Sequence, residues 1–292
     1  RQLGPNGPAV GPLALGTWRL TSDDTHRNTT LIETALDAGM NLIDTADVYG
    51  LDHGGTAFGE CETNLGKVLK ANPALRERMI LATKGGIQPP LPYDSSPAYL
   101  QQAVDASLTR LGVECIDLWQ VHRPDLFTHP AELADVLDSL QRAGKIARVG
   151  VSNFTVNQHD ALAAHLQQPL VTTQPEFSVG HLQPMRDGTL DRAMRDGIVP
   201  LAWSPLLGGR LQSGEGVRQE LLSVLDRIAA RESTHRSSIA IAFLLAHPSR
   251  PVVLLGTQTP PRLKAALSAL SVHLDRTDVY EIIAASEGQP LP

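Results

Sequence analysis

The chain has 292 residues, of which 42% are hydrophobic and 19% charged, and it contains 24 glycines and 21 prolines. This composition excludes a disordered or fibrous chain and predicts a globular protein with a large apolar core and many loops. The net charge of −6 arises from 25 basic and 31 acidic residues scattered along the chain. The basic residues form no stripe of the kind that binds a phosphate backbone, so we expect no nucleic-acid partner. No apolar run approaches the about 18 residues of a membrane span, and we expect no membrane partner.

The first residues, Arg1 to Pro5, lack the apolar segment of a secretory signal, which favours a cytoplasmic location. The two cysteines, Cys61 and Cys115, lie in no Cys-x-x-Cys or Cys/His cluster. The sequence therefore predicts neither a disulfide framework nor a zinc site.

Short apolar runs alternate along the chain with segments of helical spacing. The runs predict eight strands, at residues 13–15, 41–43, 79–82, 116–121, 146–151, 170–173, 198–203 and 252–255. Helix starts are indicated by proline at the first helical position (Pro97, Pro130, Pro260), and helix ends by glycine (Gly39, Gly112, Gly144, Gly197).

This alternation over about 250 residues predicts a (β/α)8 TIM barrel. No linker or shift in composition divides the chain, so we expect one domain over residues 1–292. The alternative is an open doubly wound sheet, which expects a Gly-x-Gly-x-x-Gly turn after its first strand. Residues 13–18 supply no such turn.

Polar residues follow six successive predicted strands: Asp44, Lys84, His122, Ser152 and Asn153, Gln174, and Trp203 with Ser204. In a barrel these strand ends meet at one rim, where the chemistry takes place. Each residue alone has an ordinary structural explanation, such as a turn cap, a solvated side chain or a packed histidine. Their occurrence at equivalent positions predicts a functional site.

Tyr49 follows Asp44 by five residues and is expected in the loop over the same rim. A free phenol has a pKa of about 10, so it needs a stabilised anion to act as an acid–base catalyst near neutral pH. An ammonium supplies that stabilisation and stays charged in a dry site when a carboxylate pairs with it, roles that suit Lys84 and Asp44. His122 could then donate or relay a proton to a carbonyl oxygen.

Five fragments, in order, resemble the aldo-keto reductase superfamily, and in particular its bacterial members. They are Asp44-Thr45-Ala46 with Tyr49, Ala82-Thr83-Lys84, Val121-His122-Arg123-Pro124, Gly150-Val151-Ser152-Asn153-Phe154 and Ala202-Trp203-Ser204-Pro205-Leu206. The resemblance covers essentially the whole chain. It implies a (β/α)8 barrel with an N-terminal β-hairpin cap, reduction of an aldehyde or ketone with NADPH, and the catalytic tetrad Asp44, Tyr49, Lys84 and His122, with Tyr49 as proton donor.

The remaining polar residues at the strand ends suit the binding of a nicotinamide cofactor. A carboxamide needs donors and an acceptor, which Ser152, Asn153 and Gln174 offer. Trp203 could stack on the nicotinamide ring, or it could pack in the barrel. The glycines after Ser204 would let backbone N–H groups approach a pyrophosphate. The predicted cofactor site comprises Thr17, Trp18, Ser152, Asn153, Gln174, Trp203, Ser204, Pro205, Leu206, Gly208, Gly256, Thr257 and Arg262.

Residues 256–263 match the family segment that binds the adenosine phosphate, with Thr257 and Arg262 as ligands of a 2′-phosphate. The sequence departs from the family pattern at Gly256, where many members have lysine, and NADPH is nevertheless expected over NADH. Substrate contacts are expected from the loops above the rim, including Trp18. Arg123 could attract an anionic substrate or form a surface ion pair.

Two other functions fit parts of this pattern. A nucleotide-binding regulatory protein with slow redox chemistry, like the β subunits of voltage-gated potassium channels, would share the fold and the tetrad. A metal-dependent hydrolase would need several carboxylate or histidine ligands at the rim, which the tetrad does not supply, so no metal is expected. The carbonyl substrate, the reaction direction and the oligomeric state stay open, and a monomer is compatible with the sequence.

Overall fold

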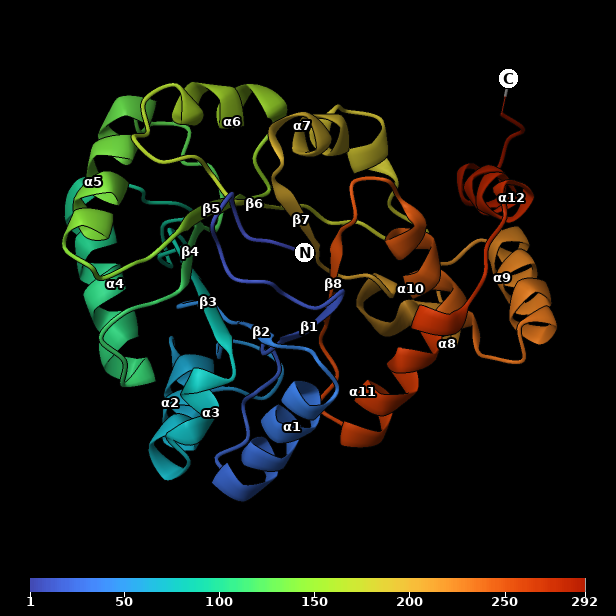
Figure 1. The fold of residues 1–292 in the computed structure, drawn as a ribbon, viewed down its shortest axis with the longest axis horizontal. Helices are drawn as coiled ribbons and strands as arrows, with labels where there is room; N and C mark the ends of the chain where they lie inside the picture. The colour runs from blue at the N-terminus through green and yellow to red at the C-terminus, as the bar shows by residue number, and fades with distance from the viewer. Residues whose placement is uncertain (292) are drawn as a thin grey trace.

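A computed structural model describes residues 1–291, in which eight parallel strands close into a barrel in the order β1 to β8. Helices surround the barrel, and the N-terminus lies near its centre when viewed along the shortest axis of the molecule (Figure 1). The strands are β1 (Leu13–Gly16), β2 (Leu42–Asp44), β3 (Ile80–Gly85), β4 (Leu118–Val121), β5 (Val149–Ser152), β6 (Thr172–Gln174), β7 (Val199–Ala202) and β8 (Val252–Leu255). The predicted (β/α)8 barrel is therefore confirmed.

Four predicted strands, at residues 116–121, 146–151, 170–173 and 198–203, are shorter than expected, and for the first of them the structure gives a clear reason. The apolar run from Ile116 predicts six residues, but β4 begins at Leu118, and Ile116 forms only an isolated bridge with Ile146. Asp117, between Ile116 and Leu118, accepts a hydrogen bond through its side chain from the backbone N–H of Leu81 at 2.7 Å. The carboxylate therefore takes the place of the backbone carbonyl that would otherwise pair with this N–H in the sheet. The strand pairing therefore starts after this residue.

Helices follow the strands in chain order. They are α1 (Thr25–Asp37), α2 (Glu60–Ala71), α3 (Ala74–Glu77), α4 (Pro97–Leu111), α5 (Pro130–Arg142), α6 (Val156–Ala163), α7 (Thr189–Asp196), α8 (Arg210–Ser213), α9 (Gln219–Arg231), α10 (Arg236–Ala246), α11 (Pro260–Ala266) and α12 (Arg276–Glu287), with short 3-10 turns at Gln183–Met185, Leu207–Gly209 and Leu267–Ser271. No helix within residues 1–291 is long and apolar enough to cross a membrane.

Local signals in the sequence set the ends of these helices. Ser96 caps α4 by accepting a hydrogen bond from the backbone N–H of Tyr99, and Pro97 occupies the first turn, where its missing N–H costs nothing. The same helix ends at Gly112, whose φ of +67° is readily adopted only by glycine. The positions marked by proline and glycine therefore begin and end helices as predicted.

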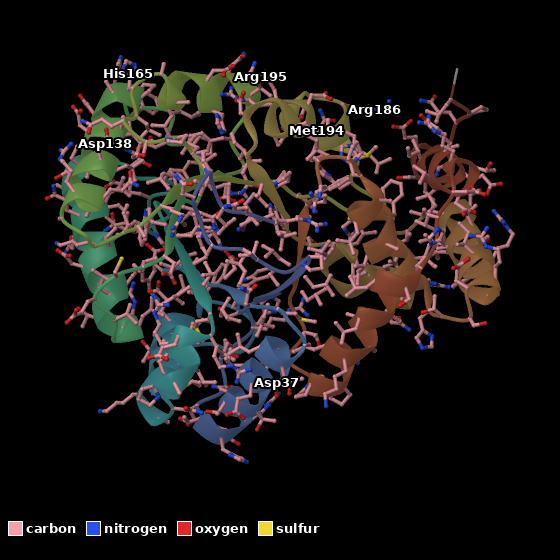
Figure 2. All side chains as sticks on the ribbon, viewed as in Figure 1. Asp37, Asp138, His165, Arg186, Met194 and Arg195 are labelled. Atoms are coloured by element: carbon pink, nitrogen blue, oxygen red, sulfur yellow. The ribbon has the colours of Figure 1, made fainter. Side chains whose placement is uncertain are left out.

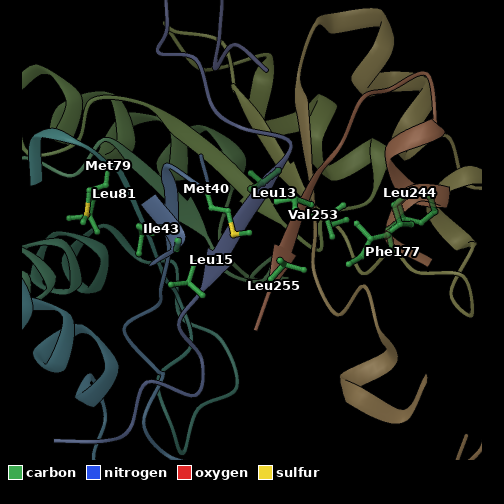
Figure 3. Close-up of a cluster of buried hydrophobic side chains, with 14 of the residues drawn as sticks. Leu13, Leu15, Met40, Ile43, Met79, Leu81, Phe177, Leu244, Val253 and Leu255 are labelled. Atoms are coloured by element: carbon green, nitrogen blue, oxygen red, sulfur yellow. The ribbon is translucent and has the colours of Figure 1, made fainter. Parts of the chain in front are cut away.

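Alternation along the strands divides the apolar core into two layers. Side chains at alternate positions fill the barrel, and the other positions pack outward against the helices. On β8, Val252 and Leu254 belong to the inner cluster, whereas Val253 and Leu255 belong to the outer one. Figure 3 shows the outer cluster, with Leu13, Leu15, Ile43, Leu81, Val253 and Leu255 among its labelled members.

The first ten residues close the N-terminal end of the barrel. Gln2 and Ala9 form an isolated antiparallel bridge, so the chain doubles back on itself there. Leu3 and Val10 are buried and pack with the inner cluster of the barrel. This end of the barrel is therefore covered by apolar side chains, and the C-terminal ends of the strands surround the opposite end, here called the mouth.

Two helices lie outside the ring of barrel helices. α9, which lies between β7 and β8 in the chain, contacts α12 near the C-terminus, and the two lie side by side at the edge of the molecule (Figure 1). Arg231 on α9 joins Asp278 on α12 through hydrogen bonds of 2.8 and 2.7 Å. Figure 2 shows that charged side chains such as Asp37, Arg186 and Arg195 lie at the outer surface, away from the barrel axis.

Candidate active site

A polar layer lies directly above the apolar interior of the barrel. Asp44 follows the inner residue Leu42 by two positions, and Lys84 follows Ala82 in the same way. Because side chains alternate along a strand, both polar groups point into the barrel. Gln120 on β4 and Gln174 on β6 extend the layer around the mouth.

Asp44 and Lys84 form a buried ion pair in this layer. Lys84 Nζ donates to Asp44 Oδ2 at 2.6 Å and to the carbonyl oxygen of Thr45 at 2.7 Å. Burial is the largest single effect and acts to lower the pKa of Lys84, but Asp44 and Tyr49 together outweigh it, and the pKa is raised above its ordinary value. The amine therefore stays charged in a site from which water is nearly excluded.

Tyr49 lies over this pair. Lys84 Nζ is 5.0 Å from the centroid of the Tyr49 ring. Burial raises the pKa of the phenol, and the Lys84 ammonium offsets only part of that rise. The expectation that Lys84 would lower this pKa below 10 is therefore not met here, because desolvation is the larger effect. The hydroxyl keeps its proton at neutral pH.

His122 completes the group of four residues that the sequence placed together. Its ring meets that of Tyr49 edge to face, with centroids 5.7 Å apart. Burial and the nearby Lys84 and Arg123 hold the pKa of His122 well below its ordinary value, so the imidazole is neutral. Nδ1 is buried and has no hydrogen-bond partner within residues 1–291. A neutral imidazole offers one N–H donor to a ligand in the mouth.

Ser152, Asn153 and Gln174 lie beside one another on neighbouring strands. Ser152 Oγ donates to the backbone carbonyl of Gln174 at 3.0 Å, and Asn153 Nδ2 donates to Ser152 Oγ at 2.8 Å. Asn153 has a positive φ of +60°, which turns its side chain back toward the rim. Trp203 Nε1 donates to Asn153 Oδ1 at 3.0 Å. These hydrogen bonds fix the position of the Asn153 amide before any ligand arrives.

Trp203 and Arg123 lie together at the mouth. The indole packs partly against the inner cluster, and the Arg123 guanidinium lies 5.9 Å from its ring centroid. No ion pair joins Arg123 to a carboxylate in the part of the chain that the structure describes. The surface ion pair considered from the sequence is therefore absent from residues 1–291.

The loop after β7 crosses the rim with an unusual backbone. Ser204 and Leu207 have φ angles of +54° and +56°, and Gly208 and Gly209 follow at +69° and +103°. Both glycines are exposed, and a Cβ on either would contact nothing within 4 Å. Arg19, which follows β1, donates to the carbonyl of Gly208 at 3.2 Å. Pro205 and Leu206 lie in the same loop.

The segment after β8 lies at the same end of the barrel. Gly256 and Arg262 are exposed, and Thr257 is half-buried. Within residues 1–291 no hydrogen bond joins Arg262 to a carboxylate, and Gln258 Nε2 is buried without an acceptor. The segment thus offers an exposed guanidinium and contains a buried amide nitrogen without an acceptor. No hydrogen bond among the described residues links it to the four central residues.

Thr17 and Trp18 follow β1. Thr17 is fully buried and donates through Oγ1 to the carbonyl of Asp44 at 3.2 Å, so it supports the backbone of the site. Trp18 is 42% exposed and stands at the rim, with its centroid 6.3 Å from that of Tyr49. Its Nε1 donates to Asp52 at 3.1 Å, and His53 packs edge-on against it at 4.3 Å.

Sequence reasoning missed Gln120 and Thr172. Gln120 Nε2 donates to Asp44 Oδ1 at 3.2 Å, and Thr172 Oγ1 donates to Gln120 Oε1 at 3.2 Å. Neither residue lies at the C-terminal end of its strand, where the polar residues predicted from the sequence lie. The alternation of side chains along a strand could have identified Gln120. It precedes His122 by two positions, so if His122 faces the barrel interior, Gln120 does too.

Known proteins share the fold and much of the sequence of this chain. The Aldo/keto reductase family model matches residues 12–287. A 6-dehydroglucose reductase of Novosphingobium aromaticivorans is 49% identical over 298 residues, covering 100% of this chain and 97% of that protein. A 6-dehydroglucose reductase of Agrobacterium fabrum is 35% identical, covering 95% and 94%. A thermostable aldo-keto reductase solved with the inhibitor epalrestat superimposes with a TM-score of 0.84 over 98% of both chains at 24% identity.

Proposed function

The chain belongs to the aldo/keto reductase family, and from that premise we propose that it uses NADPH to reduce the aldehyde group of a sugar, with Tyr49 as the proton donor. The observation that carries the proposal is the cluster of four residues at the mouth. It combines a charged Lys84, its partner Asp44, a protonated phenol and a neutral imidazole. These groups supply a proton donor and stabilisation of the developing negative charge on the oxygen, which reduction of a carbonyl uses.

The chemistry assigned to the chain is delivery of one proton to the carbonyl oxygen. When bound, the nicotinamide cofactor supplies the hydride that reduces the carbonyl carbon. Tyr49 keeps its proton until the hydride is transferred, because burial raises the pKa of its phenol. Lys84 then stabilises the phenolate that remains, while Asp44 keeps Lys84 charged and in place. The His122 N–H is in reach of the same mouth and orients the carbonyl oxygen.

The donor set at the rim fits a nicotinamide carboxamide. Gln174 Nε2 donates to Asp44 Oδ1 at 3.1 Å, while the side-chain oxygen of Gln174 accepts no hydrogen bond within residues 1–291. That oxygen is free for a carboxamide N–H, and Ser152 and Asn153 lie next to it. Trp203 offers an aromatic face at the same edge of the mouth.

The phosphates would be held by the loops after β7 and β8. The exposed backbone of Gly208 and Gly209 suits a pyrophosphate, because no side chain blocks its approach. Arg262 and Thr257 are the proposed ligands of the 2′-phosphate that distinguishes NADPH from NADH. The unsatisfied Gln258 amide in the same segment supports a ligand at this place.

The substrate class is suggested by the relatives and by the rim. Two of the relatives are named 6-dehydroglucose reductases, and glucose oxidised at carbon 6 is an aldehyde. The rim above Tyr49 carries an exposed indole, Trp18, together with Asp52 and His53. An aromatic face next to polar groups suits the C–H faces and hydroxyls of a sugar.

Steady-state oxidation of NADPH tests the proposal, with 6-dehydroglucose and hexanal as paired substrates. We expect turnover of both and a higher kcat/KM for the sugar aldehyde, because only this substrate forms hydrogen bonds with the rim. Equal kcat/KM values would remove the sugar from the proposal. Absence of turnover with either aldehyde, in a protein that binds NADPH, would favour a regulatory role instead.

A further inference from the structure

We propose that Gln120 is a positioning residue that joins the two halves of the site, the Asp44–Lys84 ion pair and the amide of Gln174. The inference rests on the proposed function, in which Gln174 accepts a hydrogen bond from the nicotinamide carboxamide. Gln120 itself lies too deep to touch a ligand, since it is fully buried within β4. Its effect on cofactor binding must therefore pass through Gln174.

Four hydrogen bonds define this link. Gln120 Nε2 donates to Asp44 Oδ1 at 3.2 Å, and Gln174 Nε2 donates to the same oxygen at 3.1 Å. Gln120 Oε1 accepts from Gln174 Nε2 at 3.4 Å and from Thr172 Oγ1 at 3.2 Å. Asp44 Oδ1, Gln120 Oε1 and the Gln174 amide therefore form a closed triangle inside the barrel.

The chemistry of the neighbours determines which way the Gln120 amide points. A carboxylate only accepts hydrogen bonds, so the nitrogen of Gln120 must face Asp44. The opposite orientation would bring two oxygens together at Asp44 and two NH2 groups together at Gln174. Because the Asp44 carboxylate is paired with Lys84 and offers only acceptors to its other neighbours, the ion pair itself fixes the orientation of Gln120.

The orientation of Gln174 follows from that of Gln120. Its NH2 group has two hydrogens, one for Asp44 Oδ1 and the other for Gln120 Oε1. With both donors held inside the barrel, the side-chain oxygen of Gln174 is presented to the mouth as an acceptor. Removing the Gln120 amide would free one of these hydrogens and let the Gln174 side chain rotate.

The neighbouring strand leaves room for this arrangement. Gly150 pairs with Gln120 on one side and with Thr172 on the other. A Cβ at Gly150 would clash with Thr172 Oγ1 and approach the Gln120 Cγ to 3.2 Å. The absence of a side chain at this position therefore lets Thr172 reach Gln120 and anchor its oxygen.

The test compares two cofactors in a Gln120→Met variant. NADP⁺ carries a carboxamide, whereas its 3-acetylpyridine analogue carries a methyl ketone at the same ring position and has no N–H for Gln174. Affinities are measured by quenching of tryptophan fluorescence, so no turnover is needed. We expect Gln120→Met to weaken binding of NADP⁺ by about fivefold, the loss of one hydrogen bond, and to leave binding of the analogue unchanged. The same substitution at the exposed Gln219 on α9 serves as the control.

The outcomes separate the two proposals. Parallel losses for both cofactors in Gln120→Met would assign Gln120 to packing alone and overturn the inference, while leaving the proposed function intact. A parent protein that binds neither cofactor would overturn both. If Gln120→Met does not fold, Thr172→Val takes its place, because it removes one donor to Gln120 Oε1. We expect this variant to weaken binding of NADP⁺, but not of the analogue, by about twofold. Equal NADP⁺ affinities for parent and variant would then contradict the link.

Discussion

At the scale of single residues, the hydrogen bonds of the site converge on Asp44. One oxygen accepts from Lys84 at 2.6 Å, and the other accepts from two amides at 3.1 and 3.2 Å. The residue is 2% exposed, so these donors replace the water that an ionised carboxylate would otherwise bind. Asp44 and Lys84 should therefore behave as a unit when either is replaced.

Lys84→Met is expected to destabilise the protein by about 3 to 5 kcal/mol, because it leaves the Asp44 carboxylate buried without its cation. The double variant Lys84→Met/Asp44→Asn removes both charges and should be more stable than Lys84→Met alone. Urea unfolding of the parent, the single variants and the double variant measures the coupling. Purely additive losses would mean that the two side chains do not stabilise each other.

Arg262→Ala is expected to weaken NADPH binding by about 1.5 kcal/mol, the lower end of the range for a hydrogen bond to a charged group, because Arg262 is exposed to solvent. Binding of NADH, which lacks the 2′-phosphate, should stay nearly unchanged. Raised salt should weaken NADPH binding more than NADH binding in the parent. Fluorescence titrations with both cofactors measure this, and equal losses would show that Arg262 does not contact the extra phosphate.

At the scale of elements, α6 carries a buried histidine outside the site. His159 is 5% exposed, and neither ring nitrogen has a partner within residues 1–291. Burial, helped by the nearby Arg192, lowers the pKa of His159 to about 4. In the unfolded chain the His159 imidazole takes up a proton near its ordinary pKa of about 6.5, whereas in the folded state it stays neutral until a lower pH. This contribution to stability is complete above that value and is lost as the pH falls toward 4.

His159→Leu should remove this pH dependence. Between pH 7 and pH 5 the parent is expected to lose about 2 kcal/mol more stability than the variant, since the unfolded state gains a proton that the folded state does not. Urea unfolding at the two pH values measures the difference. His26→Gln, at an exposed position on α1, is the control. An equal loss in parent and His159→Leu would contradict the account.

The elements also show where prediction from the sequence succeeds. Every predicted strand was found because parallel barrel strands are short apolar runs, and the helix ends were found because Pro97 and Gly112 act locally. The pair α9 and α12 was not predicted, because its contact joins segments far apart in the chain through Arg231 and Asp278. The sequence around Arg231 does not indicate Asp278 as its partner, and the sequence around Asp278 does not indicate Arg231.

At the scale of the whole molecule, closure of the barrel explains why much of the site could be placed in advance. Eight parallel strands bring their C-terminal ends to one rim, so Asp44, Lys84 and His122 meet although 78 positions separate the first from the last. The layer below the rim depends on three-dimensional contacts such as those of Gln120. The pKa of Tyr49 likewise depends on burial, which no local pattern reports.

The proposed reaction transfers a hydride from NADPH to a carbonyl carbon while Tyr49 supplies the proton. The direct measurement uses NADPH carrying deuterium at both positions of nicotinamide carbon 4, with 6-dehydroglucose as substrate and mass spectrometry of the product. We expect one deuterium in the product glucose for each NADPH oxidised by the parent, and almost no product from Tyr49→Phe, which keeps its NADPH affinity. Glucose without deuterium, or equal product from parent and Tyr49→Phe, would show that the reaction does not proceed in this way.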